Sequence, residues 1–240
     1  MLSSHFKSKG YVETVHQLID FCKKSNTKLI HTSTLSVSGN SFEEYENDRE
    51  IRFGEDNLYI GQPLDNVYAR SKFEAEKAVL EAMSDGLQAN IMRMGFLSNR
   101  YSDCVFQKNY ESNAFLKRIM AIIKLGEIPK SFEQMPIEFT PIDLAANAVM
   151  TITRNFNSEF NVFHICNVKT IPMGQVINYL NKLGINVNII EDVEFYDALK
   201  NIKQNDENSN VFEAFANDFK GDNKLDYSSK IVLDNDFSVE

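Results

Sequence analysis

Residues 66–94 read NVYARSKFEAEKAVLEAMSDGLQANIMRM, and this stretch decides the fold class. Its first part, residues 66–84, has the spacing of an amphipathic helix that ends at Asp85-Gly86. Its last part, residues 89–94, has the composition of a strand. A helix that leads directly into a strand is half of a βαβ repeat, so the stretch predicts a parallel sheet.

The same order of elements occurs on both sides of this stretch. Upstream, residues 11–25 have helical spacing and residues 28–33 form a short β-prone run. Downstream, we predict helices over 113–125, 144–154 and 173–183, strands over 161–166 and 186–190, and an extended piece over 136–141. The alternation of strands and helices predicts an α/β protein with a mainly parallel sheet.

The remaining segments have no clear period. Residues 39–66 are expected to be a solvated loop, and residues 99–112 are expected to be irregular. From about residue 192 the chain is rich in Asn, Asp and Lys, and residues 203–210 are expected to form an exposed linker. Two alternatives stay open for the tail, residues 222–240, which is either a last packed segment or frayed.

Composition narrows the class of protein. The chain has 240 residues, 43% of them hydrophobic and 25% charged, which suits one large domain or a domain with a subdomain. The formal net charge is −9 and no basic stripe offsets it, so nucleic-acid binding is disfavoured. No apolar run approaches the roughly 20 residues of a membrane span.

The N-terminus and the cysteines predict a cytoplasmic protein. Residues 1–10 are polar and have no apolar region of a signal peptide. Cys22, Cys104 and Cys166 are far apart and lack the spacing of metal ligands, so they are expected to be reduced thiols and no metal site is predicted.

Tyr68 and Lys72 are the first candidates for chemistry. Four residues apart on a helix, they lie on the same face. An ammonium beside a phenol favours the phenolate, which makes the phenol a suitable proton donor near neutral pH. Tyr–Lys pairs are also common on helix surfaces, so the pair alone does not establish a site.

Thr34 is the second candidate, because it follows the predicted strand 28–33. Ligands of open α/β sheets bind outside the carboxyl ends of the strands, where Ser33 and Ser36 would also lie. A hydroxyl there can donate to a carbonyl oxygen. Taken alone, a Thr after a strand is usually a turn residue. Together with Tyr68 and Lys72, it predicts a carbonyl-reducing site.

Several motifs, in this order, resemble a known family. They are HTSTLSV (31–37), GQ (61–62), NVY (66–68), SKFEAE (71–76), RMG (93–95), NR (99–100), FQKN (106–109), NAF (113–115), IEFTPID (137–143) and FHI (163–165). The chain resembles the extended short-chain dehydrogenase/reductase superfamily over residues 6–200. Within it, FQKN, NAF and EFTPID point to the terminal thioester reductase domain of non-ribosomal peptide synthetases, which is related to carboxylic acid reductases and male-sterility-type acyl reductases.

The resemblance implies an activity and a fold. NADPH would reduce an acyl or peptidyl thioester on a phosphopantetheinyl carrier protein to an aldehyde or alcohol. The fold would be a Rossmann-like parallel sheet, truncated at its N-terminus, with a smaller C-terminal substrate-binding subdomain. Residues 1–135 would form the catalytic part, with 99–135 entering the substrate cleft. Residues 136–240 would form mainly the subdomain, with 137–170 returning to the sheet.

The resemblance also assigns residues. Thr34, Tyr68 and Lys72 would be catalytic. The cofactor would be bound by Ser33, Lys72, Arg93 and Gly95, and the substrate cleft would contain Ser36, Gln107, Asn109 and Asn113. For Gln107, Asn109 and Asn113 the alternative is that they are loop and helix-cap residues. His164 is expected to be a core histidine.

Three departures from the family pattern stand against these assignments. Gly10 stands where the family usually has an Asn that shapes the active site, Glu13 where it has a Gly, and Cys104 where it has a Gly. The 240 residues also contain no GxxGxxG loop for a dinucleotide pyrophosphate. We therefore expect weak binding of NADPH by these residues alone, and an unpaired edge at the strand 28–33 that needs a missing N-terminal half, another partner or self-association.

Two alternatives to the reductase stay open. The chain could be a non-catalytic remnant that binds a carrier protein or an acyl chain. It could also be a nucleotide-sugar epimerase or dehydratase, which would share Thr34, Tyr68 and Lys72 but would leave FQKN and EFTPID unexplained.

Overall fold

The computed structural model describes residues 2–39, 51–64, 66–109, 113–156, 160–203, 215, 231–235 and 238. They fall into two compact units. Unit 1 is Met1–Ser102, Phe139–Val168 and Ser229–Glu240, and unit 2 is Asp103–Glu138 and Lys169–Ser228. The resemblance places residues 99–135 with the catalytic part, where they enter the substrate cleft, and this assignment stays a prediction; by contacts, residues 103–138 group with unit 2. Residues 139–168 return to unit 1.

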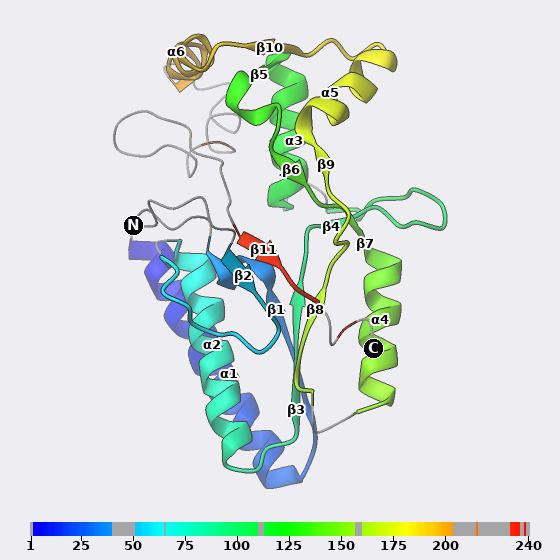
Figure 1. Ribbon diagram of the computed structural model, residues 1–240. Coiled ribbons are helices and arrows are strands. Elements are labelled where there is room, and N and C mark those ends of the chain that lie inside the picture. Colours follow the sequence, from blue (N-terminus) through cyan, green and yellow to red (C-terminus); the bar gives the residue numbers. More distant parts are fainter. Residues whose placement is uncertain are drawn as a thin grey trace. The chain divides into compact units, whose positions relative to one another are not determined.

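A parallel sheet forms the centre of unit 1, which confirms the predicted fold class (Figure 1). Its strands are β1 (Leu29–Thr34), β3 (Ala89–Met94) and β8 (Val162–Ile165), in the order β1-β3-β8. The register pairs Ser33 with Arg93 and Arg93 with His164. Within the described residues β1 pairs with β3 alone, so its other edge has no strand partner there.

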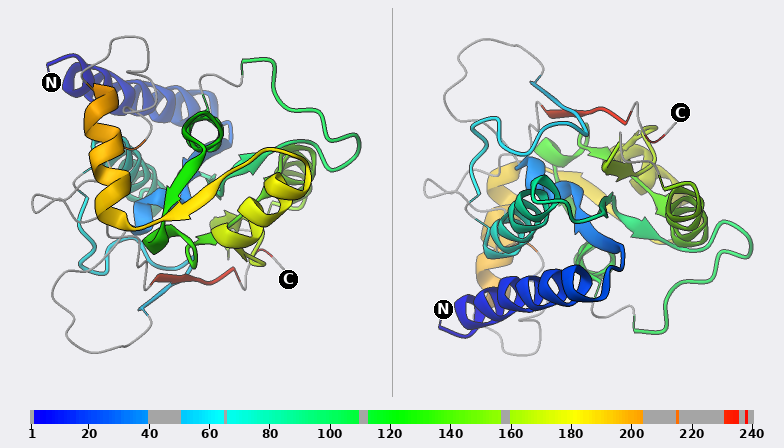
Figure 2. Two further views of the ribbon diagram at one scale, coloured as in Figure 1. Left: turned by 90° about the horizontal axis from the view of Figure 1, so that it is seen from above. Right: turned by 90° about the horizontal axis from the view of Figure 1, so that it is seen from below.

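Helices cover both faces of this sheet. Helices α1 (Leu2–Ser25) and α2 (Val67–Ser84) pack together on one face, and the right-hand view of Figure 2 shows them side by side. The apolar core beneath them contains Val15, Ile19, Ala75, Val79 and Ile91. On the other face, α4 (Ile142–Arg154) packs through Ala145 against Met92, Phe163 and Ile165.

Local signals fix the position of α2. The Asn66 side chain accepts hydrogen bonds from the backbone N–H groups of Tyr68 at 2.7 Å and Ala69 at 3.4 Å. This cap starts the helix one turn before Lys72. At the other end, Gly86 has a φ of 96°, a conformation that glycine adopts without strain. The predicted helix is confirmed almost residue for residue.

The segment after residue 50 corrects the prediction of a solvated loop. Strand β2 (Ile51–Phe53) pairs in parallel with β11 (Ile231–Leu233), which shows that this part of the tail is packed. Phe53, Glu55 and Gln62 are all buried. The loop is therefore anchored to the interior of unit 1 at these three side chains, while other residues of it, such as Tyr59, are exposed. Residues 40–50 lie outside the described residues.

Short elements complete unit 1. The 3-10 helix η1 (Leu35–Ser38) follows β1 directly. Strands β4 (Leu97–Ser98) and β7 (Thr140–Pro141) pair in parallel. Residues 99–109 form no helix or strand, as the sequence predicts.

Unit 2 consists of helices and short strand pairs. Its helices are α3 (Ala114–Leu125), η3 (Lys130–Phe132), α5 (Met173–Lys182) and α6 (Asp192–Lys203). Strand β5 (Glu127–Pro129) pairs with β10 (Asn188–Ile190), and β6 (Pro136–Ile137) pairs with β9 (Ile171–Pro172). The core contains an aromatic cluster of Phe132, Phe195 and Phe215.

Helix α6 is an element that the sequence analysis did not predict. The helix is polar overall, but two of its apolar residues, Phe195 and Leu199, are four positions apart and fully buried. Most of the predicted linker, residues 204–210, lies outside the described residues. Among the helices that the structure describes, none is long and apolar enough to cross a membrane.

Candidate functional site

Lys72 is held by two hydrogen bonds at the sheet. Its Nζ donates to the carbonyl oxygen of Thr32 on β1 at 3.1 Å and to Oη of Tyr11 on α1 at 2.8 Å. Burial lowers the pKa of the Lys72 ammonium, while Tyr68 and Glu76 act in the opposite direction. A lysine ammonium has three N–H donors, so one is left for a further partner.

Tyr68 lies in the first turn of α2, one turn before Lys72. It is 53% exposed, so its side chain is open to an approaching ligand. Both residues lie on α2, four positions apart, so they share one face of the helix. The helix keeps the spacing that the sequence shows, and the action of the phenol and the ammonium as a pair stays a prediction.

Thr34 ends β1 and caps η1. Its Oγ1 accepts a hydrogen bond from the Ser36 N–H at 3.2 Å and lies 3.2 Å from Ser36 Oγ, to which it donates. Helix α2 packs against both β1 and η1, so Thr34, Tyr68 and Lys72 belong to one region at the carboxyl end of β1. That their three polar groups meet on one substrate atom stays a prediction.

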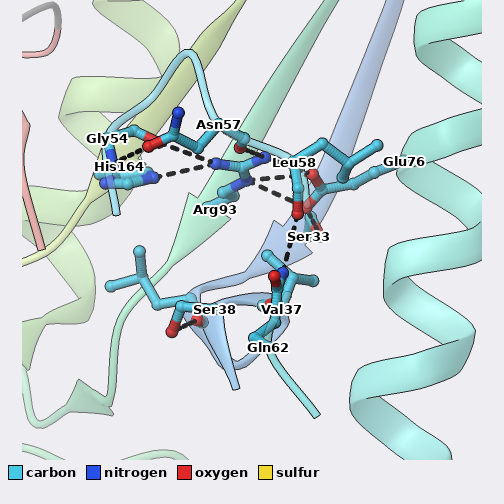
Figure 3. A network of polar contacts seen from close by, with 11 residues as sticks. Ser33, Val37, Ser38, Gly54, Asn57, Leu58, Gln62, Glu76, Arg93 and His164 are labelled. Atoms are coloured by element: carbon cyan, nitrogen blue, oxygen red, sulfur yellow. Dashed lines mark hydrogen bonds and ion pairs between the residues drawn. The ribbon is translucent and has the colours of Figure 1, made fainter. Parts of the chain in front are cut away.

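A buried polar network lies beneath this region (Figure 3). The guanidinium of Arg93 on β3 contacts the Glu76 carboxylate on α2, with Nη2 2.8 Å and Nε 3.0 Å from Oε2. Both side chains are completely buried. The Ser33 hydroxyl donates to the same carboxylate. Glu76 therefore ties α2 to two strands at once.

The far end of the network joins a loop and β8. Arg93 donates from Nη2 to the Asn57 carbonyl at 2.7 Å and from Nη1 to the Gly54 carbonyl at 3.4 Å, and Nη1 lies 3.1 Å from His164 Nε2. Burial and the charge of Arg93 lower the pKa of His164 to about 4. His164 is a core histidine, as the sequence predicts. The side chains of Ser33 and Arg93 are both buried and hydrogen-bonded within unit 1. Their predicted contacts with a cofactor stay predictions.

Comparison with known proteins assigns the family. Residues 8–149 match the family model of NAD-binding proteins described as male sterility protein. The chain belongs to the male sterility protein family. A curated relative, glycine betaine reductase ATRR of Emericella nidulans, is 30% identical over 120 residues, which are 49% of this chain and 9% of that protein.

Solved structures agree with this assignment. A thiolation-reductase di-domain of an archaeal non-ribosomal peptide synthetase is 32% identical, with a TM-score of 0.72, over 92% of this chain and 47% of that chain. The reductase domain of the aureusimine biosynthetic cluster, 24% identical, has the same fold, with a TM-score of 0.76 over 97% of this chain and 58% of that chain. The male sterility family member described here thus spans about half of these solved relatives and a small part of the curated one.

The donor set of this family member fits one end of a nicotinamide nucleotide. The third N–H of Lys72 and the hydroxyl of Tyr68, a residue that is exposed as a whole, are suited to a ribose hydroxyl and a reducible carbonyl. Gly95 follows β3 and donates its N–H to the Ile165 carbonyl at 3.0 Å, so the backbone that the prediction places beside the nicotinamide is fixed.

The predicted cleft residues fall into both units. Ser36 is in unit 1, whereas Gln107, Asn109 and Asn113 are in unit 2. Gln107 Nε2 donates to the Asn109 carbonyl at 3.3 Å, and Asn113 Oδ1 accepts from the Leu116 N–H at 2.9 Å. Asn113 thus caps α3, which is the alternative to a substrate contact that the sequence analysis left open. The predicted role of these residues toward a substrate stays a prediction.

Three residues of this region were not assigned from the sequence. Glu76 follows Lys72 by one helical turn, a spacing that could have singled it out. Gln62 is buried and donates to the Val37 carbonyl at 2.9 Å, which holds the loop against η1. Tyr11 is 61 residues from Lys72, and no local pattern relates the two.

Proposed function

We propose that this chain provides the catalytic residues of an NAD(P)H-dependent reductase that acts on an acyl or peptidyl thioester held by a carrier protein. The observation that carries the proposal is Lys72, fixed to β1 and α1 by two hydrogen bonds and one helical turn from the exposed Tyr68. Membership of an NAD-binding family and likeness to reductase domains of peptide synthetases support it.

Each residue has a defined task in this reaction. The bound nicotinamide would supply a hydride to the carbonyl carbon of the thioester. Tyr68 gives its proton to the carbonyl oxygen, so that a hemithioacetal forms, which then releases thiol and aldehyde. Lys72 stabilises the resulting phenolate and donates to a ribose hydroxyl through its remaining N–H. Thr34 can orient the carbonyl only by turning its hydroxyl away from Ser36, because the resting hydrogen bond points there.

The test is a reductase assay of the full-length gene product. A pantetheine acyl thioester serves as substrate with NADPH and with NADH, and both nicotinamide oxidation and aldehyde are measured. Tyr68→Phe should lower kcat by about 100-fold or more, since a positioned general acid contributes that much. Tyr101→Phe is the matched control, because Tyr101 is 74% exposed in the same unit.

Two results would overturn the proposal. One is thioester reduction that Tyr68→Phe leaves unchanged, and the other is the absence of nicotinamide oxidation with any acyl thioester. Saturable thioester or carrier-protein binding without oxidation would favour the binding module, and turnover of a nucleotide sugar would favour the epimerase alternative.

A further inference from the structure

Tyr11 contacts Lys72 in two ways. Its Oη accepts the 2.8 Å hydrogen bond from Lys72 Nζ, and its ring centroid lies 4.5 Å from the same atom. Tyr11 is on α1, next to Gly10 and within the segment where the sequence departs from the family pattern. Lys72 on α2 is therefore contacted by a residue of α1 from this segment.

The two acceptors of Lys72 come from different elements. Thr32 offers a carbonyl on β1, and Tyr11 offers a phenol on α1. Because an ammonium is tetrahedral, two fixed N–H directions also fix the third. With only the Thr32 bond, the side chain could rotate about that bond and its remaining N–H groups would have no set direction.

The protonation state of Tyr11 suits this role. Burial, and then the charge of Glu76, raise the pKa of the Tyr11 phenol, so it stays neutral and accepts through a lone pair. The titratable groups around Lys72 are Tyr68 and Glu76 on α2, Tyr11 on α1 and His31 on β1. Among these, Tyr11 accepts a hydrogen bond of 2.8 Å from the ammonium.

We propose that Tyr11 is a positioning residue of the reductase site, which together with the Thr32 carbonyl directs the third N–H of Lys72 toward the reacting groups. The proposal rests on the proposed function for its catalytic consequence. The hydrogen bond itself can be tested in the resting protein. Tyr11 acts through Lys72 and makes no contact with substrate in this role.

The first experiment titrates Lys72 without any substrate. The rate of acetylation of Lys72 is measured by mass spectrometry as a function of pH in wild type, Tyr11→Phe and Tyr101→Phe, with the exposed Lys77 as an internal reference. A hydrogen bond to the charged form favours that form. Tyr11→Phe keeps the ring and removes the acceptor, so the apparent pKa of Lys72 should fall by about one unit. Tyr101→Phe should leave it unchanged.

The second experiment measures kcat and KM against pH in the full-length protein. Tyr11→Phe should lower kcat about tenfold and move the pH profile in the same direction as the Lys72 titration, whereas a loss of packing alone would lower stability without moving the profile. Tyr11→Leu, which also removes the ring, should move the titration at least as far.

The outcomes separate this proposal from the proposed function. An unchanged Lys72 titration in both Tyr11 variants would overturn the role of Tyr11, whatever the activity. A shifted titration with an unshifted kcat profile in an active enzyme would also overturn it. If the titration shifts but the protein reduces no thioester, the hydrogen bond between Tyr11 and Lys72 is supported and the proposed reductase activity is overturned. If the variants do not fold, the ammonium protons of wild-type Lys72, followed by NMR, must still exchange with water more slowly than those of the exposed Lys77, because Tyr11 and Thr32 hold two of them in hydrogen bonds. Equal exchange would overturn the proposal.

Discussion

Glu76 and Arg93 form an ion pair with no exposed surface, and it joins the helix that carries Tyr68 and Lys72 to the middle strand of the sheet. Isolated buried charges are costly, but here the Arg93 guanidinium also reaches two loop carbonyls and His164, and the Glu76 carboxylate accepts from Ser33. The pair therefore sets where α2 lies on the sheet, and with it the two candidate catalytic residues.

Removal of one charge from this pair should be strongly destabilising. Glu76→Gln leaves the Arg93 charge buried without its counter-ion, and we expect the free energy of unfolding to fall by about 3–5 kcal/mol. Glu81→Gln is the matched control, because Glu81 lies on the same helix in a 4.0 Å pair with Lys77 and both side chains are exposed. It should change stability by less than about 1 kcal/mol.

Chemical denaturation followed by circular dichroism measures both variants. The double variant Glu76→Met with Arg93→Met should recover much of the loss, since it removes both charges. A Glu76→Gln variant as stable as Glu81→Gln would contradict the central role of this pair.

Much of the fold could be predicted from the sequence, because its signals are local. The bounds of α2 depend on a capping Asn, an apolar spacing and a terminal glycine, all within the helix or next to it. The strand at residues 89–94 was also predicted, because a short and mainly apolar run follows the end of the helix at Asp85-Gly86. Spacing also placed Tyr68 and Lys72 on one face.

The rest depends on contacts between distant segments. Glu55 accepts hydrogen bonds from the His164 N–H at 2.5 Å and the Ser238 N–H at 3.2 Å, and these partners are 109 and 183 residues away. No pattern within residues 39–66 reveals such partners, so the loop was expected to be solvated. The burial of Arg93 was missed for a related reason, since its ion pair with Glu76 and its bonds to the loop join segments that no local pattern relates.

Two buried histidines should make the protein sensitive to acid. Burial, and then Lys72, lower the pKa of His31 from 6.5 to about 4, and burial and then Arg93 lower that of His164 similarly. Between pH 6.5 and about 4 the unfolded chain binds protons that the folded chain does not. Stability is therefore full above about pH 6.5 and falls as the pH is lowered to about 4, by on the order of 3 kcal/mol for each histidine.

Denaturant titrations across this pH range test the histidine contribution. His31→Leu has similar volume and removes a side chain whose Nε2 has no hydrogen-bond partner among the described residues, so it should cost little at pH 7. In this variant the free energy of unfolding should depend less on pH, because the contribution of His31 is lost. If the free energy of unfolding falls equally steeply with decreasing pH in wild type and His31→Leu, then His31 does not titrate as expected.

The cap of α2 should control the order of the helical turn that carries Tyr68. Asn66→Ala removes the acceptor of two backbone N–H groups and should lower the free energy of unfolding by about 1 kcal/mol. Hydrogen exchange at Tyr68 and Ala69 should become faster. Asn66→Asp keeps an acceptor and should preserve protection, and equal exchange in all three proteins would exclude a role of the cap.

Thr34 combines a helix cap with a predicted contact to the substrate carbonyl, and two substitutions can separate these roles. Thr34→Val is nearly equal in volume but has no hydroxyl, so it should lose about 1 kcal/mol of stability with the cap of η1. If the hydroxyl also stabilises the developing oxyanion, kcat for thioester reduction should fall by about 100-fold. Thr34→Ser restores the oxygen and should recover both properties. A Thr34→Val enzyme with the stability loss but an unchanged kcat would limit Thr34 to the cap, because a destabilisation of that size leaves nearly all molecules folded.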